Sequence, residues 1–281
     1  MQRPLSLTVR PAVAGDQEAI QLLLASTFSP FGQAWPWREY LGRDVFWVAC
    51  CDGQLVGALL AWPDAGPVAW VRLAILAPGI GTGSWLDLTL PALSSPLRRC
   101  KARVLAWLDV GGWAGPALEG RGFRSSTQLL PLVKESRWLP SVGGAEAALR
   151  PVEREDLALL ARIDRAAFSP PWWLSETTLD RLRQESVYFS LAEWAGRCAG
   201  YATAQLTAHG AHIGRLVVLP AAQGHGIGAL LLRDLLDHLY AFGIAHVTLN
   251  TQQDNRASRR LYARFGFYPL GRRVAVWERQ I

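Results

Sequence analysis

Hydrophobic and polar positions follow two different periods along the second half of the chain, which indicates helices and strands in succession. Residues 227–242 place apolar side chains three or four positions apart, as on one face of a helix, and residues 245–250 alternate like a half-buried strand. Gly243 is a candidate left-handed C-cap, and Asn255 is an N-cap for a second helix. Residues 267–277 are strand-like again. The pattern predicts a mixed α/β (α+β) fold, with a central, mostly antiparallel sheet flanked by helices.

The same order of elements occurs twice in the sequence. Residues 9–30 match residues 149–170 without a gap, and the identical pairs are Arg10/Arg150, Pro11/Pro151, Asp16/Asp156, Phe28/Phe168, Ser29/Ser169 and Pro30/Pro170. Tryptophans follow both segments (Trp35 and Trp37, then Trp172 and Trp173), and later come hairpin turns at Asp52-Gly53 and Ala195-Gly196. A repeat this long exceeds a solenoid unit and indicates two tandem domains of one fold. The Gly/Pro/Ser-rich stretch at 140–145 sets their expected limits at 1–142 and 143–281.

Composition narrows the class of protein. With 281 residues, 50% hydrophobic and 19% charged, the chain is globular and long enough for two domains. Its net charge of +6 is spread evenly over the halves without a basic tail, so we expect no nucleic-acid partner. Four cysteines without metal-ligand spacing predict no metal site and a reducing, cytoplasmic location. No apolar run approaches the roughly 18 residues of a membrane span, and the first residues lack a signal peptide's apolar core.

A glycine-rich loop between an apolar strand and the helix at 227–242 is the main candidate for chemistry. Gly224, Gly226 and Gly228 leave amide hydrogens uncovered at the start of that helix, where a partial positive charge favours a phosphate. The spacing differs from the dinucleotide fingerprint, and no Gly-Lys-Ser/Thr follows as in a mononucleotide P-loop. The loop alone therefore leaves two interpretations open, a phosphate site and a tight turn with close helix packing.

The surrounding residues give the loop a family resemblance. Gln223, Gly226 and Gly228 match the pattern Gln/Arg-x-x-Gly-x-Gly/Ala, and Asn255 and Tyr262 precede Gly-Phe at 266–267, which resembles the GNAT acetyltransferase superfamily. The segment Phe-Ser-Pro-Pro-Trp at 168–172 is similar to that of the ribosomal-protein N-terminal alanine acetyltransferases. The resemblance covers residues 150–281 strongly and the first half weakly. It implies two tandem GNAT-like domains and acetyl transfer from acetyl-CoA, as co-substrate, to a primary amine by direct attack.

The resemblance also implies individual roles. Val217 and Val218 would pair with the pantetheine arm, and the Val218 amide would stabilise the oxyanion. Asn255 would hydrogen-bond the pantetheine, and Tyr262 would protonate the departing thiolate, unless it is a buried structural tyrosine. The diphosphate would lie on the amides of the loop, which are those of Gln223, Gly224, His225, Gly226, Ile227, Gly228 and Ala229.

The general base does not follow from the resemblance. Asn250 stands where the alanine acetyltransferases have a glutamate, and an asparagine cannot accept a proton at neutral pH. Asn250 is then a candidate substrate contact, and His212 is the candidate base because its unperturbed pKa suits the task. A surface histidine, with the proton lost to solvent, is the alternative. Trp172 and Trp173 are expected either to line the acceptor groove or to pack in the core.

The first half lacks most of these residues. The gap-free alignment places Trp85 at the position of Gly228, and Leu118 stands where Tyr262 stands. We therefore expect 1–142 to be a degenerate, non-catalytic domain that supports a catalytic domain at 143–281. The acceptor would be a peptide or protein N-terminus or a small-molecule amine, and the protein a monomer with pseudo-dimeric domains or a homodimer. A catalytically impaired acyl-CoA-binding regulator is the alternative function. Binding of nucleic acid through Arg256, Arg259, Arg260 and Arg264 is weaker, because a solvated helix face explains them.

Overall fold

The computed structural model describes residues 6–26, 36–143 and 146–281. They form two compact units, the first made of Met1–Thr127 with Val274–Ile281 and the second of Gln128–Arg273. Four residues named in the repeat, Phe28, Ser29, Pro30 and Trp35, lie outside the described residues.

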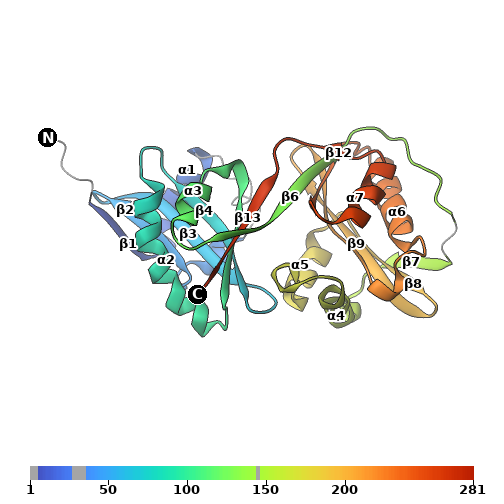
Figure 1. Cartoon of the computed structure of the whole chain (residues 1–281), viewed down its shortest axis with the longest axis horizontal. Coiled ribbons are helices and arrows are strands. Elements are labelled where there is room, and N and C mark those ends of the chain that lie inside the picture. Colours follow the sequence, from blue (N-terminus) through green and yellow to red (C-terminus); the bar gives the residue numbers. More distant parts are fainter. Residues whose placement is uncertain (1–5, 27–35, 144–145) are drawn as a thin grey trace. The chain divides into compact units, whose positions relative to one another are not determined.

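The first unit is a mixed α/β domain. Its strands β1 (Leu7–Pro11), β2 (Phe46–Cys51), β3 (Gln54–Pro63), β4 (Val68–Leu76), β5 (Val104–Asp109) and β13 (Val274–Gln280) are neighbours in that order. Among these described strands, β4 and β5 pair in parallel, and the other neighbours pair antiparallel. The helices are α1 (Gln17–Ser26), α2 (Thr82–Arg99) and α3 (Gly115–Glu119), with short 3-10 turns at Ala14–Asp16, Trp37–Tyr40 and Val110–Gly112 (Figure 1).

The second unit repeats this architecture. Its strands run in the order β7 (Ala147–Pro151), β8 (Tyr188–Trp194), β9 (Arg197–Thr207), β10 (Gly210–Val218), β11 (Val247–Gln252) and β6 (Arg124–Lys134), and β12 (Tyr268–Pro269) also pairs with β6. Its helices are α4 (Leu157–Ala167), α5 (Glu176–Glu185), α6 (Ile227–Ala241) and α7 (Arg256–Arg264), with 3-10 turns at Arg154–Asp156, Pro170–Trp172 and Pro220–Ala222. This unit has two apolar cores. Side chains of α6 contribute to one core, and side chains of α4 and α5 contribute to the other. The predicted mixed α/β class, with tandem mostly antiparallel sheets, is confirmed.

Two strands belong to the unit that the other repeat forms. β6 is the last strand of the first repeat, yet its residues from Gln128 onward belong to the second unit, where β6 pairs with β11 from Gln252↔Leu129 to Val247↔Lys134. β13 ends the second repeat, yet it pairs with β5 in the first unit. The compact units therefore differ from the contiguous ranges 1–142 and 143–281, because sheet pairing and not the linker at 140–145 assigns these strands. The strand-like stretch 267–277 is accordingly broken into β12 and β13.

The repeated Arg-Pro-…-Asp motif has the same structural role in both units. Arg150 binds both carboxylate oxygens of Asp156, at 2.7 and 2.8 Å, and that carboxylate accepts the backbone N–H of Glu153. Arg10 and Asp16 repeat this arrangement at 2.7 and 2.6 Å. The hydrogen bonds from Arg150 and Glu153 hold the pKa of Asp156 below its usual value. The motif therefore fixes the start of the first helix of each unit, which explains its recurrence without any role in catalysis.

Three simple features of the described residues complete the picture. The four cysteines are free thiols. Within the same residues, no group of three or more His, Cys, Asp or Glu side chains could hold a metal ion. Nor is any helix there both long and apolar enough to cross a membrane.

Candidate functional site

The central parallel strands of the second unit separate partway along their length. β10 and β11 pair at three positions, Ala211↔Val247, His212↔Thr248 and Ile213↔Leu249. Beyond a bulge at Gly214, residues 215–218 continue on β9, while β11 continues on β6. The two strands therefore leave a V-shaped opening in the sheet, with the start of α6 at the end of β10.

A cavity of about 310 Å³ lies at this opening. It contains nine of the ten residues predicted to bind the coenzyme, and His225 is the exception. The imidazole of His225 instead packs on Trp194, with ring centroids 4.5 Å apart. The lining consists of Ala167, Phe168, Leu216, Val217, Val218, Ala222, Gln223, Gly224, Gly226, Ile227, Gly228, Ala229, Asn255, Ala257, Ser258 and Leu261. The cavity thus joins the end of α4, the strand β10, the glycine loop and α7.

The glycine loop presents a row of free amides at the N-terminus of α6. Gly224 and Gly226 have left-handed backbone conformations, with φ of 84° and 80°, which L-residues adopt at a cost. Among the hydrogen bonds of the described residues, none is donated by the backbone N–H groups of residues 224–228. Those five amides and the dipole of a 15-residue helix suit an anion such as a diphosphate.

Asn255 caps a helix with its side-chain oxygen, and its side-chain NH₂ group takes no part in the cap. Its Oδ1 accepts the backbone N–H of Ser258 at 3.0 Å, which fixes the start of α7. The amide NH₂ group remains as a donor at the edge of the cavity. Across the cavity, Gln223 donates from Nε2 to the carbonyl oxygen of Val218 at 3.2 Å, which ties the loop to β10.

Tyr262 lies on α7 next to the cavity lining without belonging to it. The side chain is 6% exposed and packs on Phe267 with ring centroids 5.7 Å apart. Its helical neighbours Ser258 and Leu261 do line the cavity. Burial raises the pKa of the Tyr262 phenol, so the hydroxyl stays protonated at neutral pH. Its acid role stays a prediction.

His212 and Asn250 are brought to one face of the sheet near the point where the strands separate. His212 lies beside Thr248, and its Nδ1 is 2.9 Å from Thr248 Oγ1. That hydroxyl donates its own hydrogen to the carbonyl of Ala211, so it accepts from Nδ1–H and leaves Nε2 with a lone pair. Burial lowers the pKa of His212, which keeps the ring neutral. Asn250 follows Thr248 by two positions and is exposed just beyond the last β10–β11 pair.

The loop that follows α4 carries the two predicted substrate tryptophans. Neither Trp172 nor Trp173 lines the cavity. The Trp173 indole donates to the carbonyl of Phe168 at 2.8 Å, and the Trp172 carbonyl accepts from Arg215. Their place in an acceptor groove stays a prediction. Phe168 in the cavity wall and the buried charge beneath this loop were not predicted from the sequence, although a carboxylate within the apolar stripe of α4 was a visible signal.

The corresponding region of the first unit is filled by indole rings. Trp85, aligned with Gly228, is fully buried on α2. Its ring stacks on Trp113 with centroids 6.1 Å apart and meets Trp107 edge-on at 6.3 Å. Leu118, aligned with Tyr262, is also fully buried. The aligned helix start in the first unit therefore carries an aromatic cluster where the second unit has a glycine beside its cavity.

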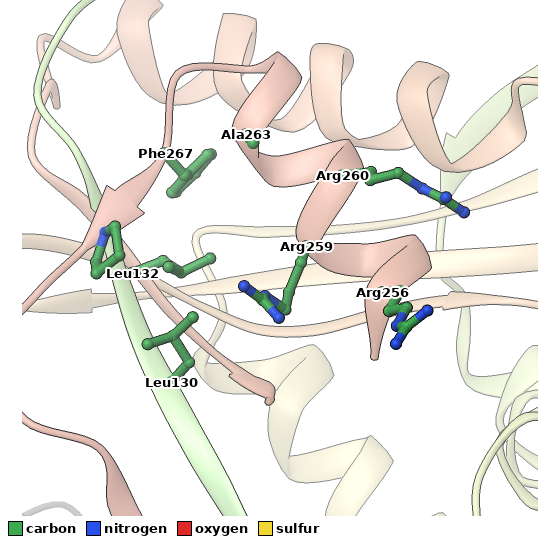
Figure 2. A pocket seen from close by; sticks show the side chains of 8 residues that line it. Leu130, Leu132, Arg256, Arg259, Arg260, Ala263 and Phe267 are labelled. Carbon is green, nitrogen blue, oxygen red and sulfur yellow. The ribbon is translucent and has the colours of Figure 1, made fainter. Parts of the chain in front are cut away.

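A second hollow of about 470 Å³ lies on the other face of α7 (Figure 2). Its floor is apolar, and Leu130 and Leu132 of β6 contribute to it. Arg259 reaches over this floor and donates to the carbonyl of Gln253 at 3.0 Å. The full lining is Leu130, Leu132, Arg256, Arg259, Arg260, Ala263, Phe267 and Pro269. None of these residues belongs to the first cavity, so the two hollows are separate.

Comparison with known proteins gives this arrangement a family. Residues 157–267 match the model of the acetyltransferase (GNAT) family. A phosphinothricin N-acetyltransferase of Streptomyces coelicolor is 31% identical over an alignment of 154 residues that covers 46% of this chain and 86% of that protein. The [ribosomal protein bS18]-alanine N-acetyltransferase of Escherichia coli is 32% identical over 117 residues, or 41% of this chain and 77% of the relative. The chain belongs to the GNAT family.

Solved structures extend the likeness to the whole chain. A tandem GNAT protein from the clavulanic acid biosynthesis pathway superposes with a TM-score of 0.67 at 20% identity, covering 98% of both chains. At this identity the match establishes the tandem fold. Members of the GNAT family use acetyl-CoA as co-substrate, and the free amides of the loop, the backbone of β10 and the amide of Asn255 are donors and acceptors of the kind that such a molecule requires.

Proposed function

We propose that the second unit transfers an acetyl group from acetyl-CoA to a primary amine. The five free amides at residues 224–228, placed where β10 and β11 separate, are the observation that carries the proposal. They suit the diphosphate, the NH₂ group of Asn255 suits an amide of the pantetheine arm, and the apolar part of the cavity suits its methylene chain. The two relatives described above are N-acetyltransferases, which supports an amine as acceptor.

The strand β10 supplies the candidate oxyanion donor. Leu219 donates its N–H to Ala199 of β9 at 2.8 Å. Because successive N–H groups along a strand point to opposite edges, the Val218 N–H is directed away from β9, toward the opening. Negative charge develops on the thioester oxygen when an amine attacks, and a fixed N–H directed there lowers the barrier.

The proton transfers follow from the two candidate catalytic residues. The amine nitrogen attacks the thioester carbon, the C–S bond breaks, and the acetyl group remains on nitrogen as an amide. His212 Nε2 removes the proton that the nitrogen loses, directly or through water, and the Tyr262 hydroxyl donates a proton to the departing thiolate. Asn250 and the loop of Trp172 and Trp173 would contact an acceptor that is either a peptide or protein N-terminus or a small-molecule amine. The first unit, with Trp85 at the position of Gly228, would be a non-catalytic support.

Calorimetric titration with coenzyme A and thiol release from acetyl-CoA together test this function. We expect one coenzyme per chain, and thiol release that depends on an added amine across a panel of peptides with free N-termini and small amines. No binding would refute the site, and two coenzymes per chain would refute a non-catalytic first unit. If the chain binds coenzyme A but releases no thiol with any amine of the panel, the result would support an acyl-CoA-binding protein in place of an enzyme.

A further inference from the structure

A fully buried carboxylate lies beneath the loop that follows α4. Asp164, on α4, has no exposed surface. Its Oδ2 accepts the hydroxyl of Tyr201 at 2.7 Å, and Oδ1 accepts the backbone N–H of Leu174 at 2.9 Å. Arg215 of β10 donates to the same carboxylate from Nε at 2.9 Å and from Nη2 at 2.7 Å. Burial raises the pKa of Tyr201, so the phenol remains a donor to the carboxylate.

Arg215 also holds the loop itself. Its Nη2 donates to the carbonyl of Trp172, and its guanidinium lies over the ring of Phe168, 3.8 Å from the centroid. One end of the loop thus leaves α4 at Phe168, its middle is held by Arg215, and its far end is held at Leu174 by Asp164. Phe168 lines the cavity, and Arg215 directly precedes the cavity residues 216–218 on β10. The ion pair therefore sets the distance between one wall of the cavity and the strand opposite.

The first repeat provides an internal comparison. In the gap-free match of residues 9–30 with 149–170, the position of Asp164 is occupied by Leu24, which is 1% exposed in an apolar core. A helix of this repeat therefore packs on its sheet without a carboxylate at that site. If the buried charge were a requirement of the fold, both copies would need it. The buried carboxylate is present in the copy that has the cavity and absent from the copy that has the indole cluster, although the arginine aligned with Arg215, Arg72, is kept in that copy.

We propose that Asp164 and Arg215 are positioning residues that hold the loop 168–174 at the acceptor side of the acetyl transfer site. The proposal rests on the function proposed above. Its energetic basis is that a buried ion pair gives specificity of geometry at little net gain in stability, since both ions are removed from water. A displacement of a substrate-positioning loop by about 1 Å is enough to slow a reaction on the order of 10²-fold.

The test compares one substitution at two ends of the same helix. Asp164→Asn removes the charge that holds Arg215, whereas Asp156→Asn removes the partner of Arg150 at the start of α4 and leaves the loop contacts in place. Arg215→Lys is the second test variant. It keeps a cation for Asp164 but lacks the planar fork that reaches both the carboxylate and the Trp172 carbonyl. The three variants are made in the full chain and compared at an assay temperature at which equal fractions of each are unfolded.

Two readouts separate positioning from general loss of stability. Hydrogen exchange should accelerate at residues 168–174 in Asp164→Asn and Arg215→Lys and remain unchanged there in Asp156→Asn. With whichever amine of the panel the wild-type protein acetylates, KM for that amine should rise about tenfold or more, while the affinity for coenzyme A changes by less than about threefold. Unchanged exchange in the loop, or an equal rise of KM in Asp156→Asn, would overturn the proposal. Wild-type protein that binds no coenzyme A would instead remove the proposed function.

Discussion

Gly226 offers the sharpest test of the proposed coenzyme site, because its backbone conformation and its free N–H can be perturbed together by one methyl group. At φ of 80° an L-residue is strained, and Gly226→Ala should lower the free energy of unfolding by roughly 1–2 kcal/mol. If the backbone relaxes instead, the amides of residues 226–228 turn away from the cavity. Losing two hydrogen bonds to a charged phosphate, at about 1.5–3 kcal/mol each, weakens coenzyme A binding by about 10²-fold or more.

Two further glycines serve as controls for Gly226→Ala. Gly79 precedes α2 in the first unit, has φ of 86° and has open space where an alanine methyl group would lie, so Gly79→Ala imposes the same strain far along the chain from the cavity. Gly228→Ala imposes none, since its added carbon would make ordinary contacts, 3.5 Å from Leu261 and 3.5 Å from Val218. We expect Gly79→Ala to lower the free energy of unfolding with unchanged coenzyme affinity. Gly228→Ala should leave the free energy of unfolding close to that of wild type and the coenzyme affinity within about threefold of it.

Calorimetry with coenzyme A and thermal unfolding measure the two quantities separately. The stability loss of Gly226→Ala and Gly79→Ala should appear as a decrease in Tm of about 2–8 °C. Wild-type affinity in Gly226→Ala would refute the assignment of the loop amides to the diphosphate. Equal loss of affinity in Gly79→Ala would show that strain alone, and not loop geometry, governs binding.

Three other predictions concern single side chains. Tyr262→Phe should lower kcat for thiol release by roughly 10²-fold with nearly intact coenzyme affinity, and unaltered turnover would reject the acid role. Burial lowers the pKa of His212 from 6.5, so the unfolded chain binds this proton at a higher pH than the folded chain does. The free energy of unfolding should therefore decrease as the pH falls from about 6.5 to the folded-state pKa of His212. In urea titrations, His212→Gln should remove this pH dependence. Burial likewise lowers the pKa of Lys134 from 10.5, so stability should rise with pH from the folded-state pKa toward 10.5; Lys134→Met should flatten this rise, and an unchanged slope would contradict the pKa direction.

The fold could be predicted from the sequence to the extent that its signals are local. Periodicity placed the helix at 227–242 within a residue of α6, and the hairpin turns fall at Ala195-Gly196 and Asp52-Gly53, where φ is positive. The exchange of β6 and β13 was not predictable in this way. Alternation of apolar and polar residues predicts a strand but not which of two similar sheet edges the strand joins. In residues 267–277 the alternation also continues across the break between β12 and β13.

The site was predictable where a motif fixes the backbone and less so where side chains meet. The loop glycines and Asn255 were predictable because each belongs to a local motif, the glycines to a turn and Asn255 to a helix cap. Asp164 and Arg215 are distant in sequence, and each alone is an ordinary charged residue. Their partnership depends on α4 packing against β10, which no spacing states. The environment of His212 also needed the structure, because its tautomer follows from a hydroxyl on the neighbouring strand.

The position of β13 bears on how the protein is made. Residues 274–281 complete the sheet of the first unit, so while the chain is being synthesised β5 keeps an open edge until nearly all of both units has been translated. β6, by contrast, is available early and waits for β11. An unpaired edge is a site for pairing with other chains. During translation both β5 and β6 therefore lack their final partners, and a chain cut at the linker would separate β5 from β13 and β6 from β11 permanently.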